Sequence, residues 1–211
     1  MTLVNKKIYL VRHGQTDYNK KGIVQGSGVN STLNNWGRRQ ADAFYATYRH
    51  YKFDKVYTSA LKRTAESVKK FIKKGIPHEV LPGLNEISWG IQEGREVTPE
   101  SDEYYNRVIN SWRSGDTSLK IEDGDSPEDV AARQKEAMEH IMSKEHEDKV
   151  LVCSHGRAMR ILLCQLLNYP LKYMDVFEHS NLGLYELTYT GSMFVLDRYN
   201  DTSHLDILDT L

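Results

Sequence analysis

The stretch "IYLVRHGQT", residues 8–16, sets a run of four apolar residues directly against an arginine, a histidine and a glycine. A short apolar run of this kind is typical of a strand covered on both faces. A second stretch, "VLVCSHG" at 150–156, repeats the arrangement with an apolar run that ends on a His-Gly pair. In an open α/β sheet, ligands bind beyond the carboxyl ends of the parallel strands. We therefore expect His13 and His155 to lie in one shared site.

Helical and extended patterns alternate along the rest of the chain. Helices are expected at 32–51, 61–75, 99–113, 126–146 and 157–167, and further strands at 55–59, 78–82, 183–189 and 193–199. The last two strands surround Thr190 and Gly191, which indicates a closing hairpin. Strands that alternate with helices predict a three-layer α/β/α sandwich around a mainly parallel central sheet.

Composition bounds the class of protein. A chain of 211 residues that is 39% hydrophobic can bury one core, so we expect one domain over 1–211, with a cap-like insertion at about 87–124. The formal net charge is −1, from 28 basic and 29 acidic residues. No global field therefore favours nucleic acid or a membrane surface as a partner, and any anion site must be local.

The amino-terminal sequence and the cysteines suggest the compartment. The chain begins without a signal-peptide pattern, and no run reaches about 18 apolar residues, so we expect a soluble, cytoplasmic protein. Cys153 and Cys164 are too few for a disulfide framework and lack the spacing of a structural zinc site. Both are expected to be reduced thiols in the core.

Two arginines occur where a helix disfavours a cation. Arg63 falls in the first turn after Ser59, and Arg157 opens the helix after His155. A cation in that position opposes the helix dipole at a cost of roughly 0.3 to 1 kcal/mol. An anion bound there would remove the conflict, because free backbone N–H groups and guanidinium groups would both face it. Arg12 would join them from the end of the first strand.

Each of these features has an ordinary explanation when taken alone. A His-Gly pair at a strand end is usually a turn with a solvated histidine, Arg63 a solvated helix residue, and Glu86 a surface acid. A metal site is another alternative, although two histidines without a fitting third ligand match it poorly. These ordinary explanations would need several coincidences to account for all the features together, in this order and at strand ends.

Four ordered motifs resemble those of the histidine phosphatase superfamily, the phosphoglycerate mutase-like proteins. "RHGQTDYN" resembles the signature around the nucleophilic histidine, and "SALKRTAES" the second arginine segment. "LNEISWGIQEG" resembles the loop that carries the acid, and "VCSHG" the second histidine. The resemblance extends from Ile8 to about Tyr199 and implies the phosphoglycerate mutase-like form of the fold.

The resemblance implies a role for each catalytic residue. His13 would attack phosphorus and become a phosphohistidine. Arg12, Arg63 and His155 would neutralise the charge on the transferred phosphoryl group. Glu86 would protonate the leaving oxygen and later accept a proton from water. No metal ion or other cofactor is implied.

The resemblance also indicates which residues contact the substrate. Gly14 and Gly156 would let the backbone approach it closely. Asn19, Gln25 and Gly26 match positions that line the substrate phosphate in relatives, although Gln25 could equally serve the structure of its loop.

Arg157 stands where many relatives have a small or apolar residue. Two explanations stay open for it. Its side chain could reach the far end of the substrate, which would imply a second anionic group there. Alternatively, it could pack its aliphatic stem on the surface.

The acid loop favours hydrolysis over transfer. After "LNE" the mutases of the family continue with Arg-His-Tyr-Gly, whereas this chain has Ile87, Ser88, Trp89 and Gly90. We therefore expect a metal-independent phosphomonoester hydrolase that acts on a small phosphorylated metabolite and releases inorganic phosphate. A phosphoglycerate mutase is the alternative. A non-catalytic phospho-ligand binder is disfavoured because His13 and Glu86 are both present, and a homodimer is left open.

Overall fold

The computed structural model describes residues 6–208, so residues 1–5 and 209–211 of the expected domain lie outside it. The first half of the chain forms β1 (Lys6–Arg12), α1 (Asp17–Lys21), α2 (Asn35–Tyr48), β2 (Lys55–Thr58), α3 (Lys62–Ser67), α4 (Lys69–Lys73) and β3 (His78–Val80). The second half forms α5 (Pro99–Ser114), α6 (Pro127–Met142), β4 (Lys149–Ser154), α7 (Gly156–Leu166), β5 (Leu184–Tyr189) and β6 (Phe194–Asp201). Short 3-10 turns are η1 (Pro82–Leu84), η2 (Gly90–Gln92), η3 (Leu171–Val176) and η4 (Ser203–Leu208).

The six strands form one sheet in the order β3-β2-β4-β1-β5-β6. Strands β3, β2, β4 and β1 pair in parallel, whereas β5 runs antiparallel to both β1 and β6. The mainly parallel sheet and the closing hairpin are thus confirmed. Arg12 at the end of β1 lies opposite Ser154 at the end of β4. His13 and His155 therefore leave neighbouring strands at the same edge of the sheet.

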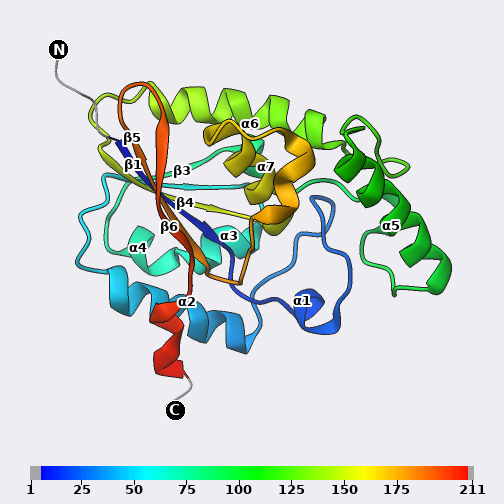
Figure 1. The fold of residues 1–211 in the computed structure, drawn as a ribbon. Coiled ribbons are helices and arrows are strands. Elements are labelled where there is room, and N and C mark those ends of the chain that lie inside the picture. The colour runs from blue at the N-terminus through cyan, green and yellow to red at the C-terminus, as the bar shows by residue number, and fades with distance from the viewer. Residues whose placement is uncertain (1–5, 209–211) are drawn as a thin grey trace.

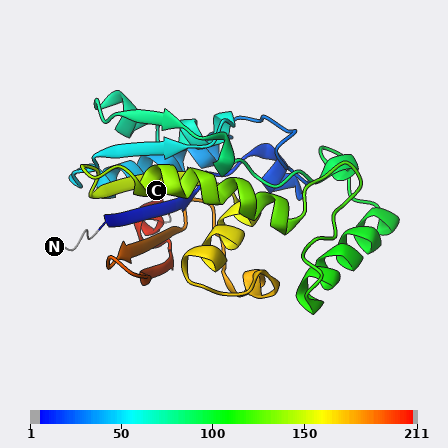
Figure 2. The same ribbon diagram turned by 90° about the horizontal axis from the view of Figure 1, so that it is seen from above.

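Helices cover both faces of the sheet, which confirms the expected sandwich (Figure 1). Successive side chains of a strand point to opposite faces. Ile8 and Leu10 of β1 accordingly pack in the core shared with α5, α6 and α7. Tyr9 and Val11 pack in the core shared with α2 and α4 on the other face. Figure 2 shows the two helical layers and, at one end of the molecule, α5 extending away from the sheet.

Element boundaries differ from the sequence expectation where polar side chains cap the backbone. Helix α2 begins at Asn35 because the Asn34 side chain accepts a hydrogen bond from the backbone of Gly37. The helix expected over 61–75 is divided into α3 and α4 at Val68, whose backbone leaves the helical region. Trp36 in the first turn of α2 is 37% exposed, so it lies outside the face that this helix buries.

The expected start of a helix at 126 and the expected burial of both cysteines are confirmed. Ser126 caps α6 with Pro127 in its first turn. Cys153 and Cys164 are free and buried. None of the helices within residues 6–208 is long and apolar enough to cross a membrane.

Two glycines fix the turn that carries His13. A Cβ atom on Gly37 would lie 2.1 Å from the carbonyl oxygen of Gln15, and one on Gly14 would lie 2.7 Å from the carbonyl oxygen of Gly37. The first turn of α2 therefore packs directly against the backbone that follows β1.

Gly37→Ala is expected to lower the free energy of unfolding by about 1 to 3 kcal/mol because the added methyl group overpacks this contact. The sign is informative, since alanine normally stabilises a helix interior over glycine by about 1 kcal/mol. Urea denaturation measures the change. Asp42→Ala is the control, because Asp42 lies on the same helix as Gly37 and forms an exposed ion pair with Lys70 of α4. This substitution should lower the free energy of unfolding by less than about 1 kcal/mol. A Gly37→Ala protein as stable as the parent would contradict the packing argument.

Candidate active site

A cavity of about 180 Å³ opens at the carboxyl ends of β1 and β4. Seven of the eleven residues expected in the site line it: Arg12, His13, Asn19, Gln25, Glu86, Gly156 and Arg157. Val24, Trp89, Tyr105 and His179 complete its wall. Arg63, His155, Gly14 and Gly26 do not line this cavity.

His13 is buried and held in one orientation. Its Nδ1 lies 2.7 Å from the carbonyl oxygen of Gly14, which can only accept a hydrogen bond, so Nδ1 carries the proton. Burial, followed by the charges of Arg63 and Arg12, lowers the pKa of His13 well below its usual value. The imidazole is therefore neutral, and Nε2 is the ring nitrogen left with a free lone pair for chemistry in the cavity.

His155 lies beside His13, with ring centroids 5.2 Å apart. Its Nδ1 accepts a hydrogen bond from Nε of Arg63 at 3.1 Å, so Nε2 carries the proton and donates to Ser59 Oγ at 2.8 Å. Burial, followed by the charge of Arg63, lowers the pKa of His155 well below its usual value. In this structure the ring is neutral and both nitrogens are engaged, so the role expected of His155 toward a phosphoryl group stays a prediction.

Arg63 supports the site from behind the second histidine. Besides His155, its guanidinium donates to the carbonyl oxygens of Val29 at 2.6 Å and Gly26 at 3.1 Å. Arg63 is fully buried and ties the loop at 26–29 to His155. The expectation that it faces a bound anion from the first turn of its helix is not met, because the side chain is directed to these protein acceptors.

Arg12 has the free donor that Arg63 lacks. Its terminal nitrogen donates to the His179 carbonyl at 2.8 Å and lies 3.2 Å from His179 Nδ1. Its Nε is buried and has no hydrogen-bond partner within residues 6–208. Burial lowers the pKa of Arg12 to about 10, so it is still a cation at neutral pH. The cavity wall thus contains a positively charged group with an unpaired N–H.

Sequence reasoning missed His179, which follows η3 and belongs to no recognised motif. Burial and the charge of Arg12 lower its pKa to about 3, so the ring is neutral. A Cβ atom on Gly156 would lie 3.3 Å from both Arg12 Nε and His179 Nδ1. The absence of a side chain at Gly156 leaves room for the arginine and the histidine, and the expected close approach to a substrate stays a prediction.

The other two glycines have packing roles. Gly14 contacts the backbone of α2, as described above. A Cβ atom on Gly26 would lie 2.1 Å from Oε1 of Glu93, so Gly26 makes room for that carboxylate. Both residues shape the wall from outside the cavity.

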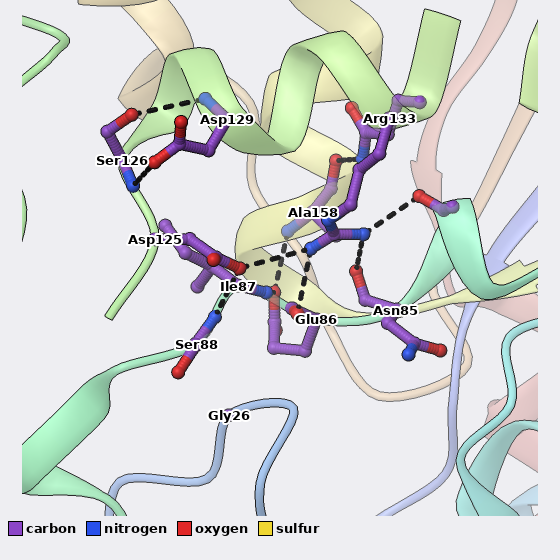
Figure 3. A network of polar contacts seen from close by, with 12 residues as sticks. Gly26, Asn85, Glu86, Ile87, Ser88, Asp125, Ser126, Asp129, Arg133 and Ala158 are labelled. Atoms are coloured by element: carbon purple, nitrogen blue, oxygen red, sulfur yellow. Dashed lines mark hydrogen bonds and ion pairs between the residues drawn. The ribbon is translucent and has the colours of Figure 1, made fainter. Parts of the chain in front are cut away.

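Glu86 caps helix α7. Its carboxylate accepts hydrogen bonds from the backbone of Arg157 at 3.1 Å and of Ala158 at 2.8 Å, and from Ile87 at 3.0 Å (Figure 3). The sequence conflict at this helix N-terminus is therefore resolved by an acid of the chain itself. The same contacts fix the Glu86 carboxyl group in the cavity wall.

Arg133 holds the loop that carries this acid. From the middle of α6 it donates to the carbonyl oxygens of Gly83 and Asn85, each at 2.8 Å, and to that of Glu86 at 2.9 Å (Figure 3). Asp125 lies 3.7 Å from the same guanidinium. Nothing in the helical pattern of α6 distinguishes Arg133 from a solvated arginine, so the sequence could not identify this role.

Asn19 and Gln25 line the cavity and also support the loop after His13. Asn19 Oδ1 accepts a hydrogen bond from the backbone of Thr16 at 3.1 Å. Gln25 Oε1 accepts from the hydroxyl groups of Thr16 and Ser31. Both amide oxygens are occupied, which orients each side-chain amide within the wall.

The fold and these contacts define an α/β protein with a neutral histidine, a partly unpaired arginine and a carboxyl group in one buried cavity. The model of the histidine phosphatase superfamily (branch 1) matches residues 8–202, and the chain belongs to this family.

Relatives and solved structures agree with this membership. A probable phosphoglycerate mutase GpmB from Yersinia enterocolitica is 29% identical over 210 residues, which covers 95% of each chain. The structure of a mycobacterial glucosyl-3-phosphoglycerate phosphatase is 25% identical, with a TM-score of 0.81 over 92% of this chain and 98% of that one. A putative alpha-ribazole-5'-P phosphatase from Escherichia coli shares the fold, with 22% identity and a TM-score of 0.83 over 93% of this chain and 97% of that one.

The buried neutral histidines make stability depend on pH. His13, His155 and His179 all have folded pKa values below their usual value. In the unfolded chain a histidine titrates near pH 6.5, so below that pH the unfolded state binds more protons. Their contribution to stability is therefore complete above about pH 6.5 and is lost as the pH falls. Each should reduce the free energy of unfolding by up to about 1.4 kcal/mol per pH unit.

Urea denaturation between pH 7.5 and pH 5 measures this slope. His179→Asn retains a polar acceptor near the position of Nδ1 but cannot titrate. It should make the pH dependence of the free energy of unfolding shallower by up to about 1.4 kcal/mol per pH unit. A free energy of unfolding that is unchanged between pH 7 and pH 5 would show that these histidines are not buried in the neutral form.

Proposed function

We propose that this protein is a phosphomonoester hydrolase that acts on a small phosphorylated metabolite through a phosphohistidine at His13. The observation that carries the proposal is the neutral His13 ring in one cavity with the unpaired Nε–H of Arg12 and the carboxyl group of Glu86. A nucleophile, a cation and an acid in one cavity are the groups that metal-free phosphoryl transfer needs.

In the first step, the lone pair on Nε2 of His13 forms a bond to phosphorus while the bond from phosphorus to the alcohol oxygen breaks. Glu86, in its protonated form, gives that oxygen a proton, and the alcohol leaves. Arg12 stabilises the charge on the equatorial phosphoryl oxygens. The proton stays on Nδ1, which donates it in a hydrogen bond to the carbonyl oxygen of Gly14, so the phosphorylated ring carries a positive charge.

In the second step, a water molecule attacks phosphorus and the bond to Nε2 breaks. Glu86 accepts the proton of this water, and inorganic phosphate leaves with the enzyme restored. Arg63 and His155 keep His13 in place, and Arg133 keeps Glu86 in place.

Further wall residues are proposed to contact the substrate. Gly156 allows close approach of the phosphoryl group to the start of α7. The amide groups of Asn19 and Gln25 contact phosphoryl oxygens, and Arg157 contacts the alcohol portion. The segment 87–124 is proposed to act as the cap of the pocket, because its Trp89 and Tyr105 line the cavity.

A phosphoglycerate mutase is the second candidate, favoured by the relatives named as probable mutases. The residues after Glu86 favour hydrolysis, because Ile87 and Ser88 stand where the mutases of the family have arginine and histidine. Incubation with 3-phosphoglycerate separates the two. The hydrolase produces inorganic phosphate and glycerate, whereas a mutase converts the substrate to 2-phosphoglycerate with little phosphate release.

His13→Ala is expected to abolish phosphate release because it removes Nε2, the atom proposed to attack phosphorus. Release from a panel of phosphoesters in the presence of EDTA measures it. His13→Asn is a second variant, since its amide can still donate to Gly14 and preserve the turn. Either variant with parental turnover and a native melting temperature would refute the role of His13.

Glu86→Gln is expected to lower kcat by about 10²- to 10⁴-fold for esters of alkyl alcohols, which need a proton on the leaving oxygen. The loss should be much smaller for 4-nitrophenyl phosphate, whose leaving group departs without one. Glu103→Gln, at an exposed position of α5, is the control and should leave both rates unchanged. An equal loss for both kinds of ester would contradict the role of Glu86 as a general acid.

A further inference from the structure

Arg157 is buried in the wall of the cavity. Its side chain is 9% exposed, which excludes the explanation that it packs on the surface. The guanidinium carbon lies 5.8 Å from the ring centroid of Trp89 and 5.6 Å from that of Trp112. Tyr105 packs against Trp89, with ring centroids 5.1 Å apart. The two indole rings hold the cation in one place, with little freedom to move toward solvent.

The positive charge at this position exceeds the negative charge beside it. Asp175 of η3 is contacted by Arg157 at 2.5 Å, by Arg160 at 2.8 Å and by Arg113 at 2.9 Å. One carboxylate thus faces three guanidinium groups, so two positive charges are uncompensated. The Arg113 side chain is 57% exposed and water solvates it, whereas that of Arg160 is only 18% exposed. The excess charge therefore lies on the buried side, on Arg157 and Arg160, and of these two Arg157 lines the cavity.

Burial of an excess cation is unfavourable unless an anion accompanies it. At the start of α7 the helix dipole adds to the cost. The first anion that enters the cavity is the phosphoryl group, and its partners are Arg12 and His13. Glu86, the one acid among the described lining residues, is already bound to the backbone of α7. Arg157 thus remains as a second positively charged position in the same cavity.

The residues that line the neighbouring cavity carry a net negative charge. A larger cavity of about 580 Å³ shares the walls Val24 and Tyr105 with the first. Its charged lining residues are one cation, Arg95, and three acids, namely Glu96, Glu100 and Asp102. An anionic group would be repelled there, so the place for it is beside Arg157.

We propose that the alcohol portion of the substrate carries a second anionic group, a carboxylate or a second phosphate, that binds to Arg157. This proposal rests on the hydrolase function proposed above and specifies its substrate class. The substrate is then a phosphorylated acid or a bisphosphate rather than the phosphate ester of a neutral alcohol.

The test compares esters that differ in one group. Glycerol 3-phosphate and 3-phosphoglycerate have the same carbon chain, and the second has a carboxylate where the first has a hydroxymethyl group. 1,3-Propanediol bisphosphate supplies a second phosphate instead. The parent protein is expected to hydrolyse either 3-phosphoglycerate or 1,3-propanediol bisphosphate with a kcat/KM at least tenfold above that for glycerol 3-phosphate. The ester with the higher value identifies the carboxylate or the phosphate as the second group.

Arg157→Gln should reduce this preference at least tenfold, mainly through KM, and Arg157→Lys should restore part of it. Arg113→Gln is the matched control, because it removes a charge from the same aspartate on the exposed side. In that variant, the ratio of kcat/KM values between the two kinds of ester should stay within twofold of the ratio in the parent protein. A parent protein that favours glycerol 3-phosphate, or equal effects of the Arg157→Gln and Arg113→Gln substitutions, would overturn the proposal.

Binding keeps the two proposals separate. If no ester releases phosphate, the hydrolase function fails, and calorimetric titration of His13→Asn with the same three compounds still tests the role of Arg157. The proposal is supported if His13→Asn binds an ester with a second anionic group more tightly than glycerol 3-phosphate. This preference should be lost when Arg157→Gln is added to His13→Asn, and partly kept when Arg157→Lys is added instead. Equal affinity for glycerol 3-phosphate and for the other two compounds overturns it.

Discussion

The parallel pairing of β1 with β4 is the constraint on which the site depends. Its register places Arg12 opposite Ser154, so the two His-Gly turns follow side by side although they are far apart in the sequence. Both strands are buried in the centre of the sheet, where a slip of register would move every apolar side chain to the wrong face. The positions of His13 and His155 are therefore fixed by the same burial that stabilises the fold.

Around this edge, burial first and neighbouring arginines second keep the histidines neutral. Arg63 donates to His155, and Arg12 lies against His179, so in both cases a guanidinium group disfavours protonation of the ring. For a nucleophile this is useful, because the attacking nitrogen needs its lone pair. In the proposed mechanism Arg12 would also stabilise the charge of the phosphoryl group, so one arrangement would serve both requirements.

The fold and much of the site could be predicted from the sequence because the signals were local. The apolar runs before each His-Gly pair predicted the strands, and the helix expected from residue 126 begins there as α6. The motifs correctly indicated seven residues of the cavity wall. What could not be predicted was the direction of long side chains. Arg63 was expected to face an anion but is directed to backbone carbonyls, and the acid at the start of α7 is Glu86, from a distant loop.

Residues recruited from outside the motifs were also missed. His179 and Arg133 act on motif residues through single contacts across the fold, and no periodicity marks them.

The most direct measurement is the position of the phosphoryl group on protein quenched in base during turnover. Because Gly14 binds Nδ1 of His13, the group is expected on Nε2 of that residue, and mass spectrometry with ³¹P NMR can identify the residue and the nitrogen. A phosphoryl group on Nδ1, on His155 or on another residue would contradict the proposed chemistry. So would steady phosphate release with no phosphohistidine on the quenched protein.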